Sequence, residues 1–262
     1  MKTRLDAELV RRGLARSREA ATDLIAAGNV LVGGMPASKA ASQVDAQTSI
    51  ILKDEHAEFV SRGGHKLAGA LDKFSELLVS GKTALDAGAS TGGFTDVLLK
   101  RGVNKVVAVD VGYGQLAWEL QKDELVKILD RVNVRNLTPA QVGDEIDLVV
   151  ADLSFISLKL VLPALISVAK EGADFLIMVK PQFEVGKEKL GAGGVVRDVH
   201  LRKEAVLEVA NAAFALTLGT LGVVASPLPG PSGNVEYFLW LRKGAPAILE
   251  VDLDLAIEKG PA

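Results

Sequence analysis

The stretch that decides the fold is Thr83-Ala84-Leu85-Asp86-Ala87-Gly88-Ala89-Ser90-Thr91-Gly92-Gly93-Phe94-Thr95. Its opening residues form an apolar run that ends in an acid, which predicts a buried strand over Thr83–Asp86. The glycines that follow let the backbone turn sharply and come close to a ligand. A strand that leads into such a turn is typical of an open α/β sheet that binds ligands at this edge.

Further apolar runs follow, spaced so that helices fit between them. They predict six more strands, at Lys105–Asp110, Leu125–Leu129, Asp147–Asp152, Asp174–Lys180, Leu221–Ala225 and Val235–Arg242. Only a short Pro/Gly-rich segment separates the last two, which predicts an antiparallel hairpin that closes the sheet. Few apolar residues are aromatic, which favours helices on a parallel sheet over a β-sandwich. The main domain is therefore predicted to be Rossmann-like α/β, with a mostly parallel sheet of seven strands.

Four of these strands end in a polar side chain, and these are Asp86, Asp110, Asp152 and Lys180. One acid after a strand is usually a helix cap. Four polar ends in succession indicate a site, because the carboxyl ends of parallel strands meet at one rim of the sheet.

The ligand is predicted from the loop and the next strand. Asp110 ends that strand, where an acid can accept both hydroxyls of a ribose. The loop lacks the Gly-x-Gly-x-x-Gly spacing and the phosphate cradle of a dinucleotide site, and an acid at its start suits a cationic amino-acid group. These features favour S-adenosylmethionine. The candidate cofactor residues are Asp86, Gly88, Ser90, Thr91, Gly92, Gly93, Phe94 and Asp110, with Asp130 placed to reach the adenine.

One competing pattern is Gly112-Tyr113-Gly114-Gln115-Leu116-Ala117, which matches a relaxed dinucleotide motif. It follows the second strand rather than the first, and such short patterns recur by chance. The chain has no cysteine and three histidines, which excludes thiolate chemistry and disfavours a multi-histidine metal site. No metal is therefore expected.

The N-terminal region has a different character. The net charge of the chain is −3, but residues 1–18 hold six basic and two acidic side chains. Such a basic face can bind phosphates. The charge by itself would also be explained by a solvated helix surface. Helical spacing of Leu5 and Leu9, a second helix between Ser17 and Gly28, and strands near Val30 and Ile50 predict a compact α/β module.

This module resembles the S4 RNA-binding fold. The resemblance rests on Arg4-Leu5-Asp6, Leu14-Ala15-Arg16-Ser17-Arg18-Glu19-Ala20 and Gly28-Asn29-Val30-Leu31-Val32-Gly33. It implies that Arg4, Arg16 and Arg18 hold RNA backbone. The predicted organisation is an S4-like domain over 1–58, a linker over 59–64, a catalytic domain over 65–244 and a C-terminal tail over 245–262.

Lys180 closes an apolar strand, which is costly unless the ammonium is paired or functional. A structural ion pair with Asp152 or Glu236 would explain it. In order and context, however, Lys66, Asp152, Lys180 and Glu236 resemble the Lys-Asp-Lys-Glu tetrad of FtsJ-like ribose methyltransferases. Their contexts are Gly63-Gly64-His65-Lys66-Leu67, Ala151-Asp152-Leu153-Ser154-Phe155-Ile156-Ser157, Val179-Lys180-Pro181-Gln182-Phe183-Glu184 and Asn234-Val235-Glu236.

Because the S4-like N-terminal domain and this tetrad occur together, the chain resembles the TlyA family, often labelled hemolysin A. The resemblance implies S-adenosylmethionine as cofactor, ribosomal RNA or ribosomal subunits as partner, and 2′-O-methylation of cytidine, with Lys180 engaging the hydroxyl. Glu58-Phe59-Val60-Ser61 keeps only part of the aromatic-rich linker of some members.

Two alternatives remain at this point. A pore-forming hemolysin would need a membrane segment, and Val209–Ser226 carries no charge over nearly a membrane span. Gly219 and Gly222 interrupt it, so a buried helix ending near Leu218 and a strand over Gly222–Ala225 are predicted instead. The charged N-terminus lacks the apolar core of a signal peptide, so a cytoplasmic protein is expected. The second alternative is a binding module with an inactive catalytic domain.

Overall fold

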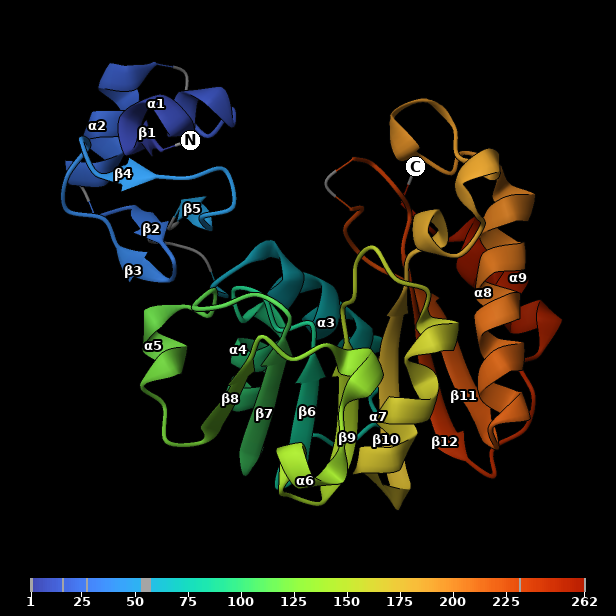
Figure 1. The fold of residues 1–262 in the computed structure, drawn as a ribbon. Helices are drawn as coiled ribbons and strands as arrows, with labels where there is room; N and C mark the ends of the chain where they lie inside the picture. The colour runs from blue at the N-terminus through green and yellow to red at the C-terminus, as the bar shows by residue number, and fades with distance from the viewer. Residues whose placement is uncertain (1, 16, 27, 53–57, 231, 262) are drawn as a thin grey trace.

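The computed structural model describes residues 2–15, 17–26, 28–52, 58–230 and 232–261. The chain forms a small N-terminal domain that ends at Leu52 and a larger α/β domain that begins after the segment joining them (Figure 1).

The N-terminal domain packs two helices against short strands. Leu5, Leu9, Ala21, Ile25 and Val30 form the centre of its small core. The helices are α1 (Leu5–Arg11) and α2 (Arg18–Ala26), and the strands are β1 (Thr3–Arg4), β2 (Val30–Val32), β3 (Met35–Pro36), β4 (Gln43–Val44) and β5 (Ile50–Leu52). β1 pairs with β4, while β2 lies between β3 and β5, all antiparallel. The predicted α/β module is confirmed.

The large domain is built on one seven-stranded sheet, as predicted. Its order is β11-β12-β10-β9-β6-β7-β8. β12 is antiparallel to both of its neighbours, and the other paired strands are parallel, which confirms the closing hairpin. The strands are β6 (Thr83–Ala87), β7 (Lys105–Asp110), β8 (Val126–Asp130), β9 (Ile146–Ala151), β10 (Ala169–Val179), β11 (Leu218–Ala225) and β12 (Tyr237–Lys243).

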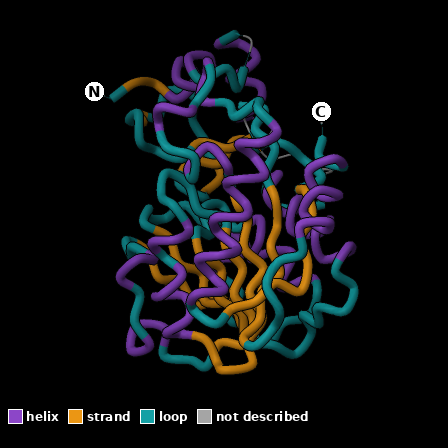
Figure 2. The backbone as a smooth tube through the Cα atoms, turned by 90° about the vertical axis from the view of Figure 1, so that its right-hand side faces the viewer, coloured by secondary structure: helices purple, strands orange, loops and turns teal. Residues whose placement is uncertain are grey.

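Helices cover both faces of this sheet (Figure 2). Successive side chains of a strand point to opposite faces, so in β7 Val106 packs in one core and Val107 in the other. The first core includes α3 (Arg62–Lys73) and α4 (Gly93–Lys100), and the second includes α7 (Leu162–Val168), α8 (Val199–Ala215) and α9 (Glu250–Glu258). Two one-turn helices, α5 (Trp118–Gln121) and α6 (Pro139–Val142), lie in loops. Short 3₁₀ turns lie at Val134–Asn136, Leu158–Leu160, Pro181–Phe183, Lys187–Lys189 and Ala192–Gly194.

Besides shifts of a few residues at strand ends, three segments differ from the prediction. Residues 62–64, placed in the linker, form the first turn of α3. α8 ends at Ala215 rather than near Leu218, where β11 already begins. The segment predicted as a C-terminal tail forms α9, whose Leu253 is fully buried in the core that α7 and α8 share. Tertiary contacts that no local motif encodes hold this last helix.

The stretch proposed for a membrane contributes to the core instead. Val209, Ala210 and Ala213 face inward from α8, and Leu218 is buried at the start of β11. Over the described part of the chain, none of the helices combines the length and hydropathy that a membrane span requires.

The two domains touch at a glycine turn. The backbone N–H of Trp118 donates to the Gly34 carbonyl at 3.0 Å. Gly34 has φ +77°, and a Cβ there would lie 2.1 Å from the Leu116 carbonyl oxygen, so the contact requires glycine. Leu116 also packs against Gly92 of the glycine loop. The N-terminal domain therefore rests on the segment that supports that loop.

Candidate active site

Three cavities meet at the carboxyl edge of the sheet. The glycine-loop cavity, of about 230 Å³, is lined by Gly88, Ala89, Ser90, Thr91, Gly93 and Phe94 together with Lys66, Asp152 and Lys180. The Asp110 cavity, of about 470 Å³, shares Gly88, Ser90 and Asp152 with it and adds Asp110, Val132 and Asn133. The Phe155 cavity, of about 900 Å³, shares Ser154 and Lys180 with the glycine-loop cavity and adds Phe155, Gln182, Phe183, Asn234 and Glu236. Lys180 therefore lies on a wall that the glycine-loop cavity and the Phe155 cavity share.

The glycine loop is held against the neighbouring strands. The N–H groups of Gly88 and Ala89 donate to the Val109 carbonyl, at 2.8 and 3.1 Å. Gly88 has φ +88°, and a Cβ there would lie 2.7 Å from the Asp152 carbonyl oxygen. Ser90 adopts φ +47°, a conformation that a non-glycine residue keeps only where its surroundings impose it. The sequence therefore places a glycine where the loop and the end of β9 come into contact.

Asp110 lines the second cavity with both carboxylate oxygens held by backbone N–H groups. Its Oδ2 accepts from the Ser90 N–H at 2.8 Å, and its Oδ1 accepts from the Gly112 N–H at 2.7 Å. Each carboxylate oxygen can accept a further hydrogen bond, so both can receive a ribose hydroxyl. Val132 and Leu153 supply apolar walls in the same cavity, which suit an adenine. These residues fit S-adenosylmethionine.

Two residues predicted to contact the cofactor are covered by other parts of the protein. Asp86 is fully buried behind the loop, where its Oδ2 accepts from Thr95 Oγ1 at 2.7 Å. Gly92 packs against Leu116 and Leu120. Asp130 accepts from the Gly114 N–H at 2.9 Å, and Val132 and Asn133, shortly after it in the chain, line the Asp110 cavity, so its contact with the adenine stays a prediction. The sequence gives the strand ends correctly, but it does not show which side chains the loops cover.

Asp86 has an unusual environment. Its Oδ1 has no hydrogen-bond partner among the described residues. Burial raises the pKa of Asp86 to about 7, because ionisation is costly away from water.

This burial predicts a pH-dependent effect of Asp86→Asn. A carboxyl whose pKa is higher in the folded state stabilises the fold fully below its unfolded pKa, and that contribution is lost as the pH rises through about 7. Asparagine cannot ionise and can still accept from Thr95. We therefore expect the Tm of the variant, relative to the parent protein, to rise between about pH 5 and pH 8. Thermal unfolding at both pH values tests this, and an unchanged difference would contradict it.

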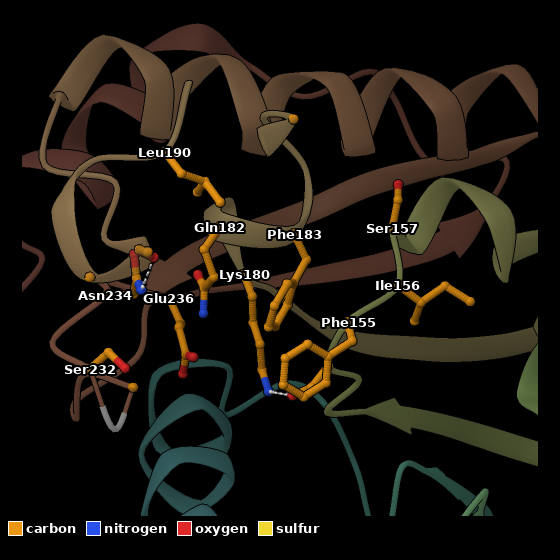
Figure 3. A pocket seen from close by; sticks show the side chains of 15 residues that line it. Phe155, Ile156, Ser157, Lys180, Gln182, Phe183, Leu190, Ser232, Asn234 and Glu236 are labelled. Atoms are coloured by element: carbon orange, nitrogen blue, oxygen red, sulfur yellow. Dashed lines mark hydrogen bonds between the residues drawn. The ribbon is translucent and has the colours of Figure 1, made fainter. Parts of the chain in front are cut away.

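The four tetrad residues form two ion pairs. Lys180 follows β10 and Asp152 follows the adjacent β9, so parallel pairing brings their side chains together at 2.5 Å. Lys180 Nζ also donates to Ser154 Oγ at 2.9 Å (Figure 3). Lys66, from the second turn of α3, pairs with Glu236 at 2.5 Å in a site that is almost inaccessible to water. Buried pairs of this kind rarely add stability over apolar packing, which favours a functional reason for them.

Phe155 follows Asp152 in the sequence and was not predicted as a site residue, but the structure leaves it exposed beside the cavity. Its side chain is 91% exposed and lies 5.1 Å from the Phe183 ring, centroid to centroid. Its φ is +64°. Glu184 anchors this loop by accepting from Ser157 Oγ at 2.6 Å and from the Leu158 N–H at 2.8 Å. An exposed aromatic residue in a strained loop is typical of a binding platform, and no local sequence pattern reports exposure.

In the N-terminal domain, two of the arginines predicted to contact RNA form ion pairs with the same aspartate. Asp6 pairs with Arg4 at 2.8 Å and with Arg18 at 2.9 Å, and these arginines, first Arg4, hold the pKa of Asp6 below its usual range. The arginine side chains remain 45% and 58% exposed, so each keeps donors for a phosphate. Arg16 lies outside the described residues.

Among the residues that the structure describes, no group of three His, Asp or Glu side chains could hold a metal ion.

The sheet with its reversed β12 strand and the fit of the Asp110 cavity to S-adenosylmethionine agree with one class of protein. The chain is an S-adenosylmethionine-dependent methyltransferase with an appended RNA-binding type of domain.

Comparison with known proteins gives the family. The model of the FtsJ-like methyltransferase matches residues 59–243, and that of the S4 domain matches residues 3–50. The chain is 56% identical, over 99% of both chains, to the 16S/23S rRNA (cytidine-2′-O)-methyltransferase TlyA of Mycobacterium tuberculosis. It is 41% identical to the candidate rRNA methyltransferase YqxC of Bacillus subtilis, over 92% of this chain and 86% of that one. A solved structure of a candidate hemolysin from Streptococcus thermophilus superposes with a TM-score of 0.77 at 35% identity, over 98% and 95% of the chains. This chain belongs to the TlyA family, in which an S4 domain precedes an FtsJ-like methyltransferase domain.

Proposed function

We propose that this enzyme methylates the 2′-hydroxyl of a cytidine in ribosomal RNA. The observation that carries the proposal is the position of Lys180 on the wall shared by the glycine-loop cavity and the Phe155 cavity. A hydroxyl held at Lys180 from the Phe155 cavity would face a methyl donor in the glycine-loop cavity. The M. tuberculosis relative is named as a 16S/23S rRNA (cytidine-2′-O)-methyltransferase, which supports the substrate class.

Bound S-adenosylmethionine supplies an electrophilic methyl group on its sulfonium. The chain's own residues orient the attacking oxygen, because methyl transfer requires in-line approach. Asp152 fixes the Lys180 ammonium through their ion pair. Lys180 Nζ would donate a hydrogen bond to the ribose oxygen, and a carboxylate oxygen of Asp152 would accept the hydroxyl proton as the methyl group passed from the sulfonium sulfur to the ribose oxygen.

The second pair shapes the site from the other side. Lys66 lines the glycine-loop cavity and Glu236 lines the Phe155 cavity, so their ion pair bridges the two. Phe155 offers an aromatic face at the mouth of the larger cavity, on which an unstacked base can rest. A nucleotide drawn out of its RNA would thus meet an aromatic platform, with Lys180 at the cavity wall.

The S4 domain supplies RNA affinity in this proposal. Phosphate contacts by arginine give affinity and register, and each releases counterions. We expect Arg18→Ala to weaken RNA binding and to reduce the slope of log affinity against log salt by about one. Filter binding of ribosomal RNA over a salt series measures this. Arg101→Ala is the control, because Arg101 pairs with Asp72 on the catalytic domain at 2.6 Å and should leave the slope unchanged. An unchanged slope for Arg18→Ala would contradict the assignment.

Transfer of labelled methyl groups to ribosomal RNA, followed by mapping of ribose methylation, tests the function. Methylated cytidine that depends on the enzyme supports it, and the same assay separates it from an inactive binding module. Methylation of a base, or none on ribosomal RNA, would refute it. Because ribosomal RNA is the substrate, we place the enzyme in the cytoplasm.

A further inference from the structure

The Phe155 cavity has a polar group that the methyl-transfer chemistry does not use. Gln182 lines it, one residue after the Pro181 that follows Lys180 (Figure 3). Its carboxamide oxygen Oε1 is buried and has no hydrogen-bond partner within the described ranges. An unsatisfied buried carbonyl is costly, so its presence calls for a partner that arrives with a ligand.

Three other polar side chains of this wall already have partners. Asn234 Oδ1 accepts from the Val196 N–H at 2.9 Å, and its Nδ2 donates to the Gly194 carbonyl at 3.1 Å. Glu236 pairs with Lys66, and Ser154 accepts from Lys180. Gln182 Oε1 is thus a hydrogen-bond acceptor in the cavity lining that has no partner among the described residues. In Figure 3 its side chain extends into the cavity with those of Lys180 and Glu236.

Cytosine offers the complement to a carboxamide. Its exocyclic N4 amino group donates and its N3 accepts, side by side on one edge. A glutamine side chain can accept from N4 through Oε1 and donate to N3 through Nε2. The torsion that orients a glutamine carboxamide is broad, so a small rotation can present both groups to a base. Uracil carries an oxygen where cytosine carries the amino group, so the carboxamide orientation that pairs with cytosine would set two acceptors against each other, and uracil would need the carboxamide turned end for end.

We propose that Gln182 selects the target base by accepting a hydrogen bond from the N4 amino group of cytosine. This inference rests on the proposed function, because it assigns a reader for the nucleotide whose ribose Lys180 engages. Selection by a buried acceptor is strong, since a base that lacks the donor leaves the acceptor unpaired in a dry site.

The test pairs a protein change with a matched change in the RNA. Gln182→Met keeps the length of the side chain and removes both hydrogen-bonding groups. The RNA is the ribosomal RNA containing the mapped target cytidine, prepared with either cytosine or 2-pyrimidinone at that position, because 2-pyrimidinone is cytosine without N4. We expect the parent enzyme to lose about tenfold to a hundredfold in kcat/KM on 2-pyrimidinone, and Gln182→Met to treat both RNAs alike.

Leu190→Ala is the control, because Leu190 lines the same cavity but has no polar atom in its side chain. It should keep the parent ratio between the two RNAs, and calorimetry should show that Gln182→Met binds S-adenosylmethionine as the parent does. If Gln182→Met still prefers cytosine as strongly as the parent, this inference is wrong but the proposed function stands. The same holds if the substitution lowers the rates on both RNAs equally, so that their ratio persists. If the parent enzyme methylates no ribose, the proposed function fails and this inference fails with it.

Discussion

Lys180→Ala is expected to lower kcat for methyl transfer by about 10³-fold or more while leaving the affinity for S-adenosylmethionine nearly unchanged. The reason is that Lys180 Nζ is placed to hold the ribose oxygen, whereas the ribose and adenine of the cofactor are assigned to the Asp110 cavity. Single-turnover transfer to ribosomal RNA gives the rate, and calorimetry with S-adenosylmethionine gives the affinity.

Lys105→Ala provides the matched control. Lys105 also pairs with an aspartate, Asp144 at 2.9 Å, but it lies at the opposite end of the sheet, where β7 begins. Its loss should leave kcat unchanged. If Lys180→Ala abolished cofactor binding as well, the separation of roles between Lys180 and the Asp110 cavity would be wrong.

Gly88→Ala is expected to weaken S-adenosylmethionine binding by about a hundredfold and to reduce transfer with it. An alanine at φ +88° is strained by about 1–2 kcal/mol, and its Cβ would lie 2.7 Å from the Asp152 carbonyl oxygen. That oxygen belongs to the backbone, so the loop or the end of β9 must move. Either movement displaces atoms that line the cofactor cavities. Calorimetry and thermal unfolding measure the two parts of this effect.

Gly81→Ala is the control that separates backbone strain from the close approach to the Asp152 carbonyl oxygen. Gly81 has φ +78°, and a Cβ there meets nothing within 4 Å. This variant should lose a similar amount of stability but bind the cofactor as the parent does. Equal losses of affinity in both variants would show that strain alone, and not the approach to Asp152, explains the requirement for glycine.

The sequence predicted the sheet because its strands are local apolar runs. It also predicted which strand ends carry Asp110, Asp152 and Lys180, since parallel strands bring their carboxyl ends to one rim. The tetrad could be named in advance from its contexts, and the structure places Lys66 against Glu236 and Lys180 against Asp152. Strand boundaries shifted by a few residues where pairing with a neighbour extends a strand beyond its apolar run, as in β10.

Long-range packing settled what local pattern could not. Asp86 and Asp110 look alike in sequence, since each ends an apolar strand, yet one is sealed behind the glycine loop and the other faces a cavity. The exposure of Phe155, the unpaired oxygen of Gln182 and the docking of Gly34 on the segment around Leu116 likewise depend on residues far away in the chain. The amino-acid sequence alone thus determined the elements and the chemistry available at the rim. Which groups meet a ligand was decided only by the tertiary structure, because burial and exposure arise when distant segments pack against one another.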